Sequence, residues 1–136
     1  MVKGIAHLAF HVNNMEASLK FYETFGIKKV FSIPNKEGKP WIEYLKVADG
    51  QFIELFYTND SFEPLPMWKN KYYAHLCLAV CDIHAIAKVI TDAGYELVVP
   101  PNKGSDGNFQ CWTCDPDGNA IEFMQIMPDS LQVRNG

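Results

Sequence analysis

The chain has 136 residues, of which 48% are hydrophobic and 21% charged, and it carries a net charge of −4. These values are typical of a single globular domain, and the acidic balance argues against nucleic acid or an anionic membrane as partner. Because the sequence contains no run of about 18 apolar residues and no N-terminal secretion signal, we expect a cytoplasmic protein that does not cross a membrane.

The first half of the chain, residues 4–58, predicts a βαβββ module. A buried strand at 4–12 leads to Asn13, which has capping-box spacing to Glu16 and should start a helix. The helix should end at Gly26. Its predicted core-facing residues are Met15, Leu19, Tyr22 and Phe25. Three further strands separated by turn residues are predicted at 28–34, 41–47 and 51–57.

Residues 59–71 contain two prolines and no clear period, which predicts a linker, and residues 72–126 predict a second βαβββ module. Its helix should begin after Asp82 and end at Gly94. The face of this helix should consist of Ile83, Ile86, Ala87 and Ile90, and the strands should cover 72–81, 95–99, 109–114 and 119–126. Pro100-Pro101 should break the strand before a loop at 102–108, and the polar tail after Pro128 should be frayed.

The two halves match at one fixed offset of 68 positions. His7 in Ile-Ala-His-Leu corresponds to His75 in Tyr-Ala-His-Leu, and Glu54 in Phe-Ile-Glu-Leu corresponds to Glu122 in Ala-Ile-Glu-Phe. The glycines that end the two predicted helices keep the same offset. A coincidence of common patterns is the alternative explanation, but so many matches at one offset favour an internal repeat. A repeat that places His and Glu at matching points predicts one symmetric site.

Four residues are the candidate ligands of a divalent metal ion: His7, Glu54, His75 and Glu122. Strand alternation puts each glutamate on an otherwise apolar face, where an unpaired carboxylate requires a cation or a proton. Taken singly, each histidine could be a hydrogen-bonded core residue, but the matched set is better explained by one shared ion. Imidazole suits Zn, Ni, Co and Fe, and carboxylates suit harder ions. We expect Ni or Zn in the first place, with Co, Mn and Fe as alternatives. Four ligands in an octahedral shell leave two positions for water or substrate oxygens.

The cysteines are predicted to be structural. They are Cys77, Cys81, Cys111 and Cys114. Without a secretion signal, disulfides are not expected. Cys111 and Cys114 have the C-x-x-C spacing of redox and zinc motifs, but they fall in a predicted strand, where residues i and i+3 point to opposite faces.

Several segments resemble the vicinal oxygen chelate superfamily, the group of glyoxalases, bleomycin-resistance proteins and extradiol dioxygenases. They are Ala-His-Leu at 6–8 and 74–76, Phe-Tyr-x-x-x-Gly-Ile at 21–27, Phe-Ile-Glu-Leu at 52–55 and Asp-Pro-Asp-Gly-Asn-x-Ile-Glu-Phe at 115–123. The resemblance covers about residues 4–126. It implies an α+β fold, with one domain over 1–136, in which two tandem βαβββ modules form curled mixed sheets around a metal-binding cleft.

Within that group, the four-ligand set is similar to that of glyoxalase I, whose metal ligands match His7, Glu54, His75 and Glu122. The resemblance implies a metal-dependent lyase or isomerase that converts the hemithioacetal of a 2-oxoaldehyde and a thiol, by proton transfer through a metal-stabilised enediolate. Glu54 and Glu122 would be both ligands and catalytic proton-transfer groups. The small-molecule substrate would be of the glutathione hemithioacetal kind, and a homodimer is expected. Whether the two modules pair within one chain or between chains stays open.

The chain departs from the glyoxalase I pattern where glutathione is held. Bacterial glyoxalase I typically has Arg at the position of Ala9 and Asn at the position of Thr58, and only Lys103 with Gly104 resembles its basic loop. Alanine cannot replace the charge-assisted contact of an arginine. Thr58 and Lys103 are the candidate substrate-binding residues, with a purely solvating role as the alternative for Lys103. Two alternatives are a related epimerase or isomerase acting on another 2-oxo or acyl-thioester substrate, and a non-catalytic small-molecule-binding or resistance protein.

Overall fold

The structure, a computed structural model, describes residues 1–67 and 69–136. The chain forms two compact units, Met1–Glu63 (unit 1) and Pro64–Gly136 (unit 2). Each unit contains one mixed four-stranded sheet and a ten-residue helix, which confirms the predicted α+β fold with two βαβββ modules. The boundary between the units falls in the predicted linker 59–71, of which residue 68 lies outside the described residues.

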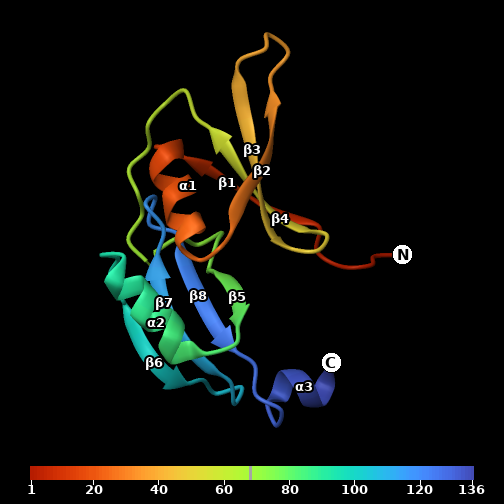
Figure 1. Cartoon of the computed structure of the whole chain (residues 1–136), viewed down its shortest axis with the longest axis vertical. Coiled ribbons are helices and arrows are strands. Elements are labelled where there is room, and N and C mark those ends of the chain that lie inside the picture. Colours follow the sequence, from red (N-terminus) through yellow and green to blue (C-terminus); the bar gives the residue numbers. More distant parts are fainter. Residues whose placement is uncertain (68) are drawn as a thin grey trace. The chain divides into compact units, whose positions relative to one another are not determined.

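Unit 1 is shown at the red-to-yellow end of the ribbon in Figure 1. Its elements are β1 (His7–Val12), α1 (Met15–Thr24), β2 (Lys28–Pro34), β3 (Pro40–Ala48) and β4 (Gln51–Tyr57). The strand order is β1-β4-β3-β2, with β1 parallel to β4 and the other neighbours antiparallel. The first and last strands of the unit are therefore adjacent, although residues 13–50 separate them in sequence.

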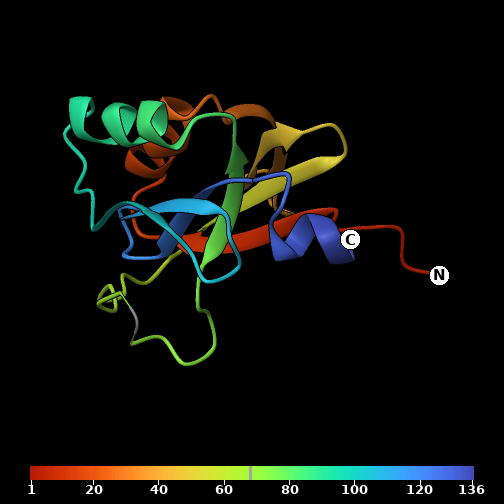
Figure 2. The same ribbon diagram turned by 90° about the horizontal axis from the view of Figure 1, so that it is seen from below.

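Unit 2 repeats this arrangement. Its elements are β5 (Leu76–Val80), α2 (Ile83–Asp92), β6 (Val99–Lys103), β7 (Phe109–Cys114), β8 (Ala120–Gln125) and α3 (Leu131–Asn135). The strand order is β5-β8-β7-β6, again with the first and last strands parallel. Helix α2 lies along one face of this sheet (Figure 2). No helix in the described part of the chain is long and apolar enough to cross a membrane.

The two main helices occupy corresponding positions, because Met15–Thr24 and Ile83–Asp92 differ by the same 68 residues. Each helix is followed by a glycine with a left-handed backbone, Gly26 at φ 80° and Gly94 at φ 81°. Glycine adopts this conformation without the steric penalty that a side chain would bring, so the helix ends predicted from these glycines are confirmed.

The helix faces differ in detail from the predicted ones. In α1 the buried residues are Met15, Ser18, Phe21 and Tyr22, whereas the predicted core residues Leu19 and Phe25 are half-buried. In α2 the buried residues are Ile83, Ala87 and Ile90, and Ile86 is half-buried. In both helices the buried side chains recur at intervals of three or four residues. The predicted helical period is therefore confirmed, but the buried face is centred on different residues from those predicted.

The helix cap of unit 1 is Asn14, so the prediction that Asn13 starts the helix is wrong. The Asn14 side chain accepts a hydrogen bond from the backbone N–H of Ala17 at 3.1 Å. The amide of Asn13 instead bonds the backbone of Phe62, donating to its carbonyl at 2.8 Å and accepting from its N–H at 2.9 Å. Both neighbouring asparagines are suitable caps by sequence, and only the contact of Asn13 with Phe62 shows that Asn14 is the cap.

Strand β6 contains Pro100 and Pro101, so the prediction that these prolines break the strand is wrong. The strand is the edge of its sheet, and its register with β7 shifts between Val99 and Asn102. Proline lacks a backbone donor, which is tolerated at a sheet edge and at an irregularity in the ladder. Strands β1 and β5 also begin later than predicted, at His7 and Leu76.

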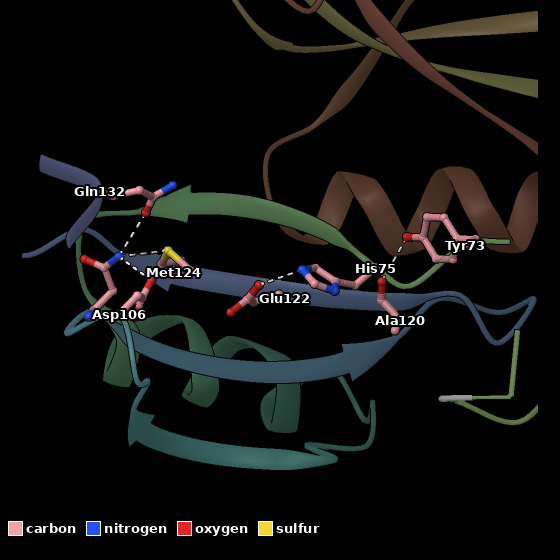
Figure 3. Close-up of polar contacts among 8 residues, drawn as sticks. Tyr73, His75, Asp106, Ala120, Glu122, Met124 and Gln132 are labelled. Carbon is pink, nitrogen blue, oxygen red and sulfur yellow. Dashed lines mark hydrogen bonds and ion pairs between the residues drawn. The ribbon is translucent and has the colours of Figure 1, made fainter. Parts of the chain in front are cut away.

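The tail is ordered rather than frayed, because Ser130 caps the short helix α3 and the buried Asn108 fastens the tail. The Asn108 amide donates to the side chains of Asp106 and Gln132 at 2.8 and 2.9 Å and to the Met124 sulfur, contacts drawn in Figure 3. Its side-chain oxygen accepts from the backbone N–H of Met127 at 2.9 Å.

We expect Asn108→Ala to lower the free energy of unfolding by about 1–3 kcal/mol, because it leaves buried polar partners without their hydrogen bonds. Urea unfolding followed by circular dichroism measures this change. Gln132→Ala removes one of these bonds at a more exposed position and should have a smaller effect. An equal effect of the two substitutions would contradict a central role for Asn108.

Candidate functional site

The first predicted pair of ligands comes together in unit 1. Glu54 lies in the middle of β4 and is 6% exposed, whereas His7 opens β1 with its side chain 47% exposed. The parallel ladder pairs His7 with Phe52 and Ala9 with Glu54, so His7 and Glu54 lie diagonally on adjacent strands. The His7 Nε2 and Glu54 Oε2 atoms are 3.6 Å apart.

Unit 2 builds the second pair in the same way. Glu122 lies in β8 and is 4% exposed, and His75 immediately precedes β5 with its side chain 36% exposed. The His75 Nε2 and Glu122 Oε2 atoms are 3.1 Å apart, and Figure 3 shows the imidazole turned toward the carboxylate. The Tyr73 hydroxyl donates to the backbone carbonyl of Ala120 at 2.9 Å, which ties the segment before His75 to the start of β8.

Strand alternation explains why each carboxylate is buried. Glu54 lies between Ile53 and Leu55, and Glu122 between Ile121 and Phe123, and these apolar neighbours are almost fully buried. Successive side chains of a strand point to opposite faces, so the apolar neighbours anchor each strand to the core and turn the glutamate to the other face. The apolar residues thereby fix the direction of each carboxylate.

The distances within each pair fit shared coordination of one ion. Two donors about 2.1 Å from an ion lie about 3.0 Å apart at an octahedral angle and about 3.4 Å apart at a tetrahedral angle. The observed separations of 3.1 and 3.6 Å are close to these values. One imidazole nitrogen and one carboxylate oxygen also suit the divalent ions predicted from the sequence.

Each unit contributes two such donors. Within residues 1–67 and 69–136, no group of three or more His, Cys, Asp or Glu side chains is arranged to hold a metal ion. The structure therefore brings His7 together with Glu54, and His75 together with Glu122, as two half-sites. The four-ligand set stays a prediction, as do the catalytic roles of the two glutamates.

A further buried carboxylate, Glu43 in β3, shows how this fold satisfies a buried charge without a ligand. The Ser32 and Tyr57 hydroxyls donate to it, and the Lys29 ammonium lies 3.3 Å away. Burial alone would raise the pKa of Glu43, but these donors outweigh burial and hold the pKa below its usual range. By contrast, His7 is the one ion-pair partner found for Glu54 among the described residues.

Glu43 should make the stability of the protein depend on pH. Its lowered pKa means that the stabilisation is present above the ordinary value near 4.5 and is lost as pH falls through the pKa of the folded state. We expect the free energy of unfolding to fall in acid, with a part of this fall absent in Glu43→Gln. Urea titrations at several pH values measure it, with Glu37→Gln, an exposed carboxylate paired with Lys39, as control. An identical pH dependence in wild type and Glu43→Gln would contradict this role.

The Cys77 thiol contacts Glu122, which the sequence analysis missed. Cys77 is paired with Glu122 in the β5–β8 ladder and donates a hydrogen bond to its carboxylate. Cys77 is exposed as a residue, but partial desolvation of its thiol, followed by the negative charge of Glu122, raises its pKa to about 12. The thiol therefore stays a donor. The signal was available, because Cys77 lies two residues after His75 on a strand and corresponds to Ala9 in unit 1.

All four cysteines are free thiols, and Cys111 and Cys114 both lie in β7 as predicted. Cys111 is fully buried, and burial followed by the charge of Glu122 raises its pKa to about 11. A thiol with a raised pKa is a poor nucleophile and a poor redox group at neutral pH.

The two candidate substrate-binding residues have different surroundings. Thr58 directly follows β4, and its hydroxyl donates to the backbone carbonyl of Val12 at 3.1 Å, which joins the ends of β4 and β1. Lys103 ends β6 and is exposed, next to Asn102, whose side chain accepts a hydrogen bond from Gln110 at 3.2 Å. Thr58 thus has a structural contact, whereas Lys103 is accessible to a ligand.

Some of the known proteins that are similar to this chain carry glyoxalase names. The chain is 29% identical over 126 residues to a probable lactoylglutathione lyase of Vibrio cholerae, covering 89% of both proteins. A glyoxalase I variant from Zea mays aligns with a TM-score of 0.76 at 21% identity, over 90% of this chain and 44% of that one. A glyoxalase family protein from Enterococcus faecalis aligns with a TM-score of 0.75 at 22% identity, over 90% of this chain and 98% of that one. The structural likenesses show the fold alone.

Residues 4–123 match the family described as the Glyoxalase/Bleomycin resistance protein/Dioxygenase superfamily. This match spans both units and includes both His–Glu pairs. The repeated βαβββ topology, with its first and last strands parallel in each sheet, agrees with it. The chain belongs to the glyoxalase, bleomycin resistance protein and dioxygenase superfamily.

Proposed function

We propose that the protein is a metal-dependent lyase or isomerase of the glyoxalase I type. The observation that carries the proposal is the repetition, in both units, of a buried glutamate beside a half-exposed histidine at the separation of two ligands of one ion. His7, Glu54, His75 and Glu122 would together hold one divalent ion, Ni or Zn in the first place. The two pairs would meet within a chain or between the chains of a homodimer.

The chemistry that these residues can perform is proton transfer beside a carbonyl group. A divalent ion bound by the four side chains would polarise the substrate carbonyl and stabilise negative charge on its oxygen. Glu54 or Glu122 would accept the proton from the carbon next to that carbonyl and return it to the carbonyl carbon. The net change is an isomerisation, so no oxidant or reductant is consumed.

The hydrogen bond from Cys77 would make the two glutamates unequal. Glu122 accepts a bond from a thiol that stays protonated, whereas the corresponding position beside Glu54 is Ala9. A hydrogen bond to a ligating carboxylate fixes its orientation toward the ion, whereas a carboxylate without such a bond is freer to move. We therefore assign the larger part in proton transfer to Glu54, and to Glu122 the firmer hold on the ion.

Two observations bear on the substrate class. The relative from Vibrio cholerae named a probable lactoylglutathione lyase supports a hemithioacetal substrate. Ala9, at a position where bacterial glyoxalase I typically has arginine, favours a second candidate, an isomerase acting on another 2-oxo or acyl-thioester compound. Both reactions use the same proton-transfer chemistry and differ in what binds beside the reacting carbon.

The decisive experiment is an isomerisation assay with apo protein reloaded separately with Ni, Zn, Co and Mn. Methylglyoxal with glutathione provides the hemithioacetal, and metal-dependent product formation supports the glyoxalase assignment. Solvent-deuterium exchange into 2-oxo acids and acyl thioesters tests the second candidate. Absence of metal binding and of turnover with every ion would refute the proposed function.

A further inference from the structure

An aromatic cluster flanks the first half-site. Phe31 and Tyr44 are stacked with ring centroids 4.3 Å apart, and Phe52 lies edge-on to both rings at 6.4 and 5.9 Å. The Tyr44 ring also meets the imidazole of His7 edge-on at 6.2 Å. We refer to Phe31, Tyr44 and Phe52 as the aromatic wall. It is in direct contact with a candidate metal ligand.

The sheet register puts the aromatic wall on the same face as Glu54. In the antiparallel ladders Tyr44 is directly opposite Glu54, and Phe31 is directly opposite Tyr44. Residues directly opposite each other across antiparallel strands project from the same face of the sheet. Phe52 precedes Glu54 by two positions on β4 and shares its face. The wall and the candidate proton-transfer group therefore belong to one surface.

The second unit shows that the fold does not require this wall. Its ladders place Trp112 opposite Glu122 and Val99 opposite Trp112, so Trp112 matches Tyr44 and Val99 matches Phe31. At the repeat offset Phe52 corresponds to Ala120. The same sheet thus forms with valine and alanine in place of two of the three rings. The His–Glu pairs are kept in both units, whereas the wall is present in one.

The rings are also incompletely buried. Phe31 is 46% exposed, and Tyr44 and Phe52 are half-buried. Leaving large aromatic surface in water forgoes the stabilisation that burial would give, and such surfaces beside a site commonly bind ligands. Rings in edge-on and stacked pairs accept a further ring in the same geometries.

We propose that the aromatic wall binds an aromatic ring on the substrate, next to the carbonyl group that reacts at the His–Glu ligands. The preferred substrate is then an aryl-substituted 2-oxo compound rather than one with a methyl group. The position of the carbonyl group in this inference rests on the proposed function. The preference for an aromatic ring comes from the wall alone. Ala9 agrees with it, because this face of β1 offers no cation at that position to an anionic substituent.

The test uses mandelate and lactate, two 2-hydroxy acids that differ only in a phenyl or a methyl group. Isothermal titration calorimetry measures the affinity of the whole chain for each, with and without bound Ni²⁺. We expect mandelate to bind at least about tenfold more tightly, because a ring offers much more apolar surface than a methyl group. Binding of Ni²⁺ is titrated separately.

The variant Phe31→Val with Phe52→Ala carries the residues of unit 2 at the matching positions. It should reduce the preference for mandelate to less than about threefold while leaving Ni²⁺ affinity unchanged, because it removes only ring contacts. Phe62→Ala is the control, since Phe62 belongs to unit 1 but to none of the ring pairs of the wall. Circular dichroism verifies that each variant is folded.

The outcomes separate this inference from the proposed function. A preference for mandelate that the double variant abolishes supports the wall, even if no metal binds and the proposed function fails. Normal Ni²⁺ binding with equal affinities for mandelate and lactate overturns the inference and leaves the proposed function standing. A preference for mandelate that survives in the double variant also overturns the inference. The inference is likewise overturned if a second copy of the chain covers the wall, which would be detected as dissociation of a dimer in the double variant.

Discussion

Glu122→Gln is expected to lower kcat/KM for metal-dependent isomerisation by about 10²–10⁴-fold, because it combines a weaker hold on the ion with the loss of the smaller part that Glu122 takes in proton transfer. The amide has nearly the same shape as the carboxylate but carries no negative charge, so it can neither balance the charge of a divalent ion nor accept a proton. The measurement is initial rates with the preferred ion at saturating concentration, with metal content determined on the same samples.

Two further variants serve as a control and as a comparison for Glu122→Gln. Glu63→Gln removes one negative charge at an exposed position outside the candidate site and should leave the rate unchanged. Glu54→Gln should lose a similar or larger part of the rate while retaining more of the metal than Glu122→Gln, because Glu122 is the carboxylate held by Cys77. Full activity in Glu122→Gln with normal metal content would contradict the assignment of this residue.

The pairing of His7 with Glu54 could be predicted because few physical factors determine it. A βαβββ module with its first strand parallel to its last places the starts of these strands side by side. The alternation of side chains then decides which residues share a face, and both rules can be applied to a bare sequence. The repeat offset supplied an independent check, since His75 and Glu122 obey the same rules.

Predictions from local sequence were wrong where a residue distant in the sequence determines the local structure. Asn13 and Asn14 are both good caps, and only the contact of Asn13 with Phe62 shows which one is free to cap. Pro100 and Pro101 read as strand breakers until the strand is known to lie at the edge of its sheet. The tail reads as polar and loose, yet the buried Asn108 orders it from another part of unit 2.

The aromatic wall illustrates a third case. The pattern around Glu54 showed apolar neighbours such as Phe52, which are equally consistent with a core. Only the exposure of Phe31 and the ring contacts of Tyr44 distinguish an open surface from packed interior. Comparison of the two units then separates what the fold needs from what the site needs, because each unit serves as a control for the other.

His7→Ala and His75→Ala are expected to weaken metal binding equally, each by more than about 100-fold, because losing even an outer-shell partner of a ligand costs 10–100-fold. This equality is the signature of one ion shared by both pairs. Calorimetric titration of each variant with the preferred ion measures affinity and stoichiometry together. His84→Ala, which changes an exposed histidine of α2, is the matched control and should bind as the wild type does.

Stoichiometry separates a shared ion from two independent ions. If each pair bound its own ion, the wild type would take up two per chain, and either variant would keep one at full affinity. If one ion joins both pairs, the wild type takes up one per chain and each variant loses it. A variant that keeps half of the metal at unchanged affinity would refute the shared site.

Mixing the two variants then decides whether the pairs join within one chain or between two. Within one chain, every site in the mixture lacks a ligand and metal binding stays weak. If sites form between the chains of a homodimer, a His7→Ala chain still has an intact His75–Glu122 pair. That pair can combine with the intact His7–Glu54 pair of a His75→Ala chain. After random exchange of subunits, about one site in four would then be complete. Recovery of that fraction of tight binding would place the metal between chains, because two chains that are each inactive would have assembled an intact set of ligands.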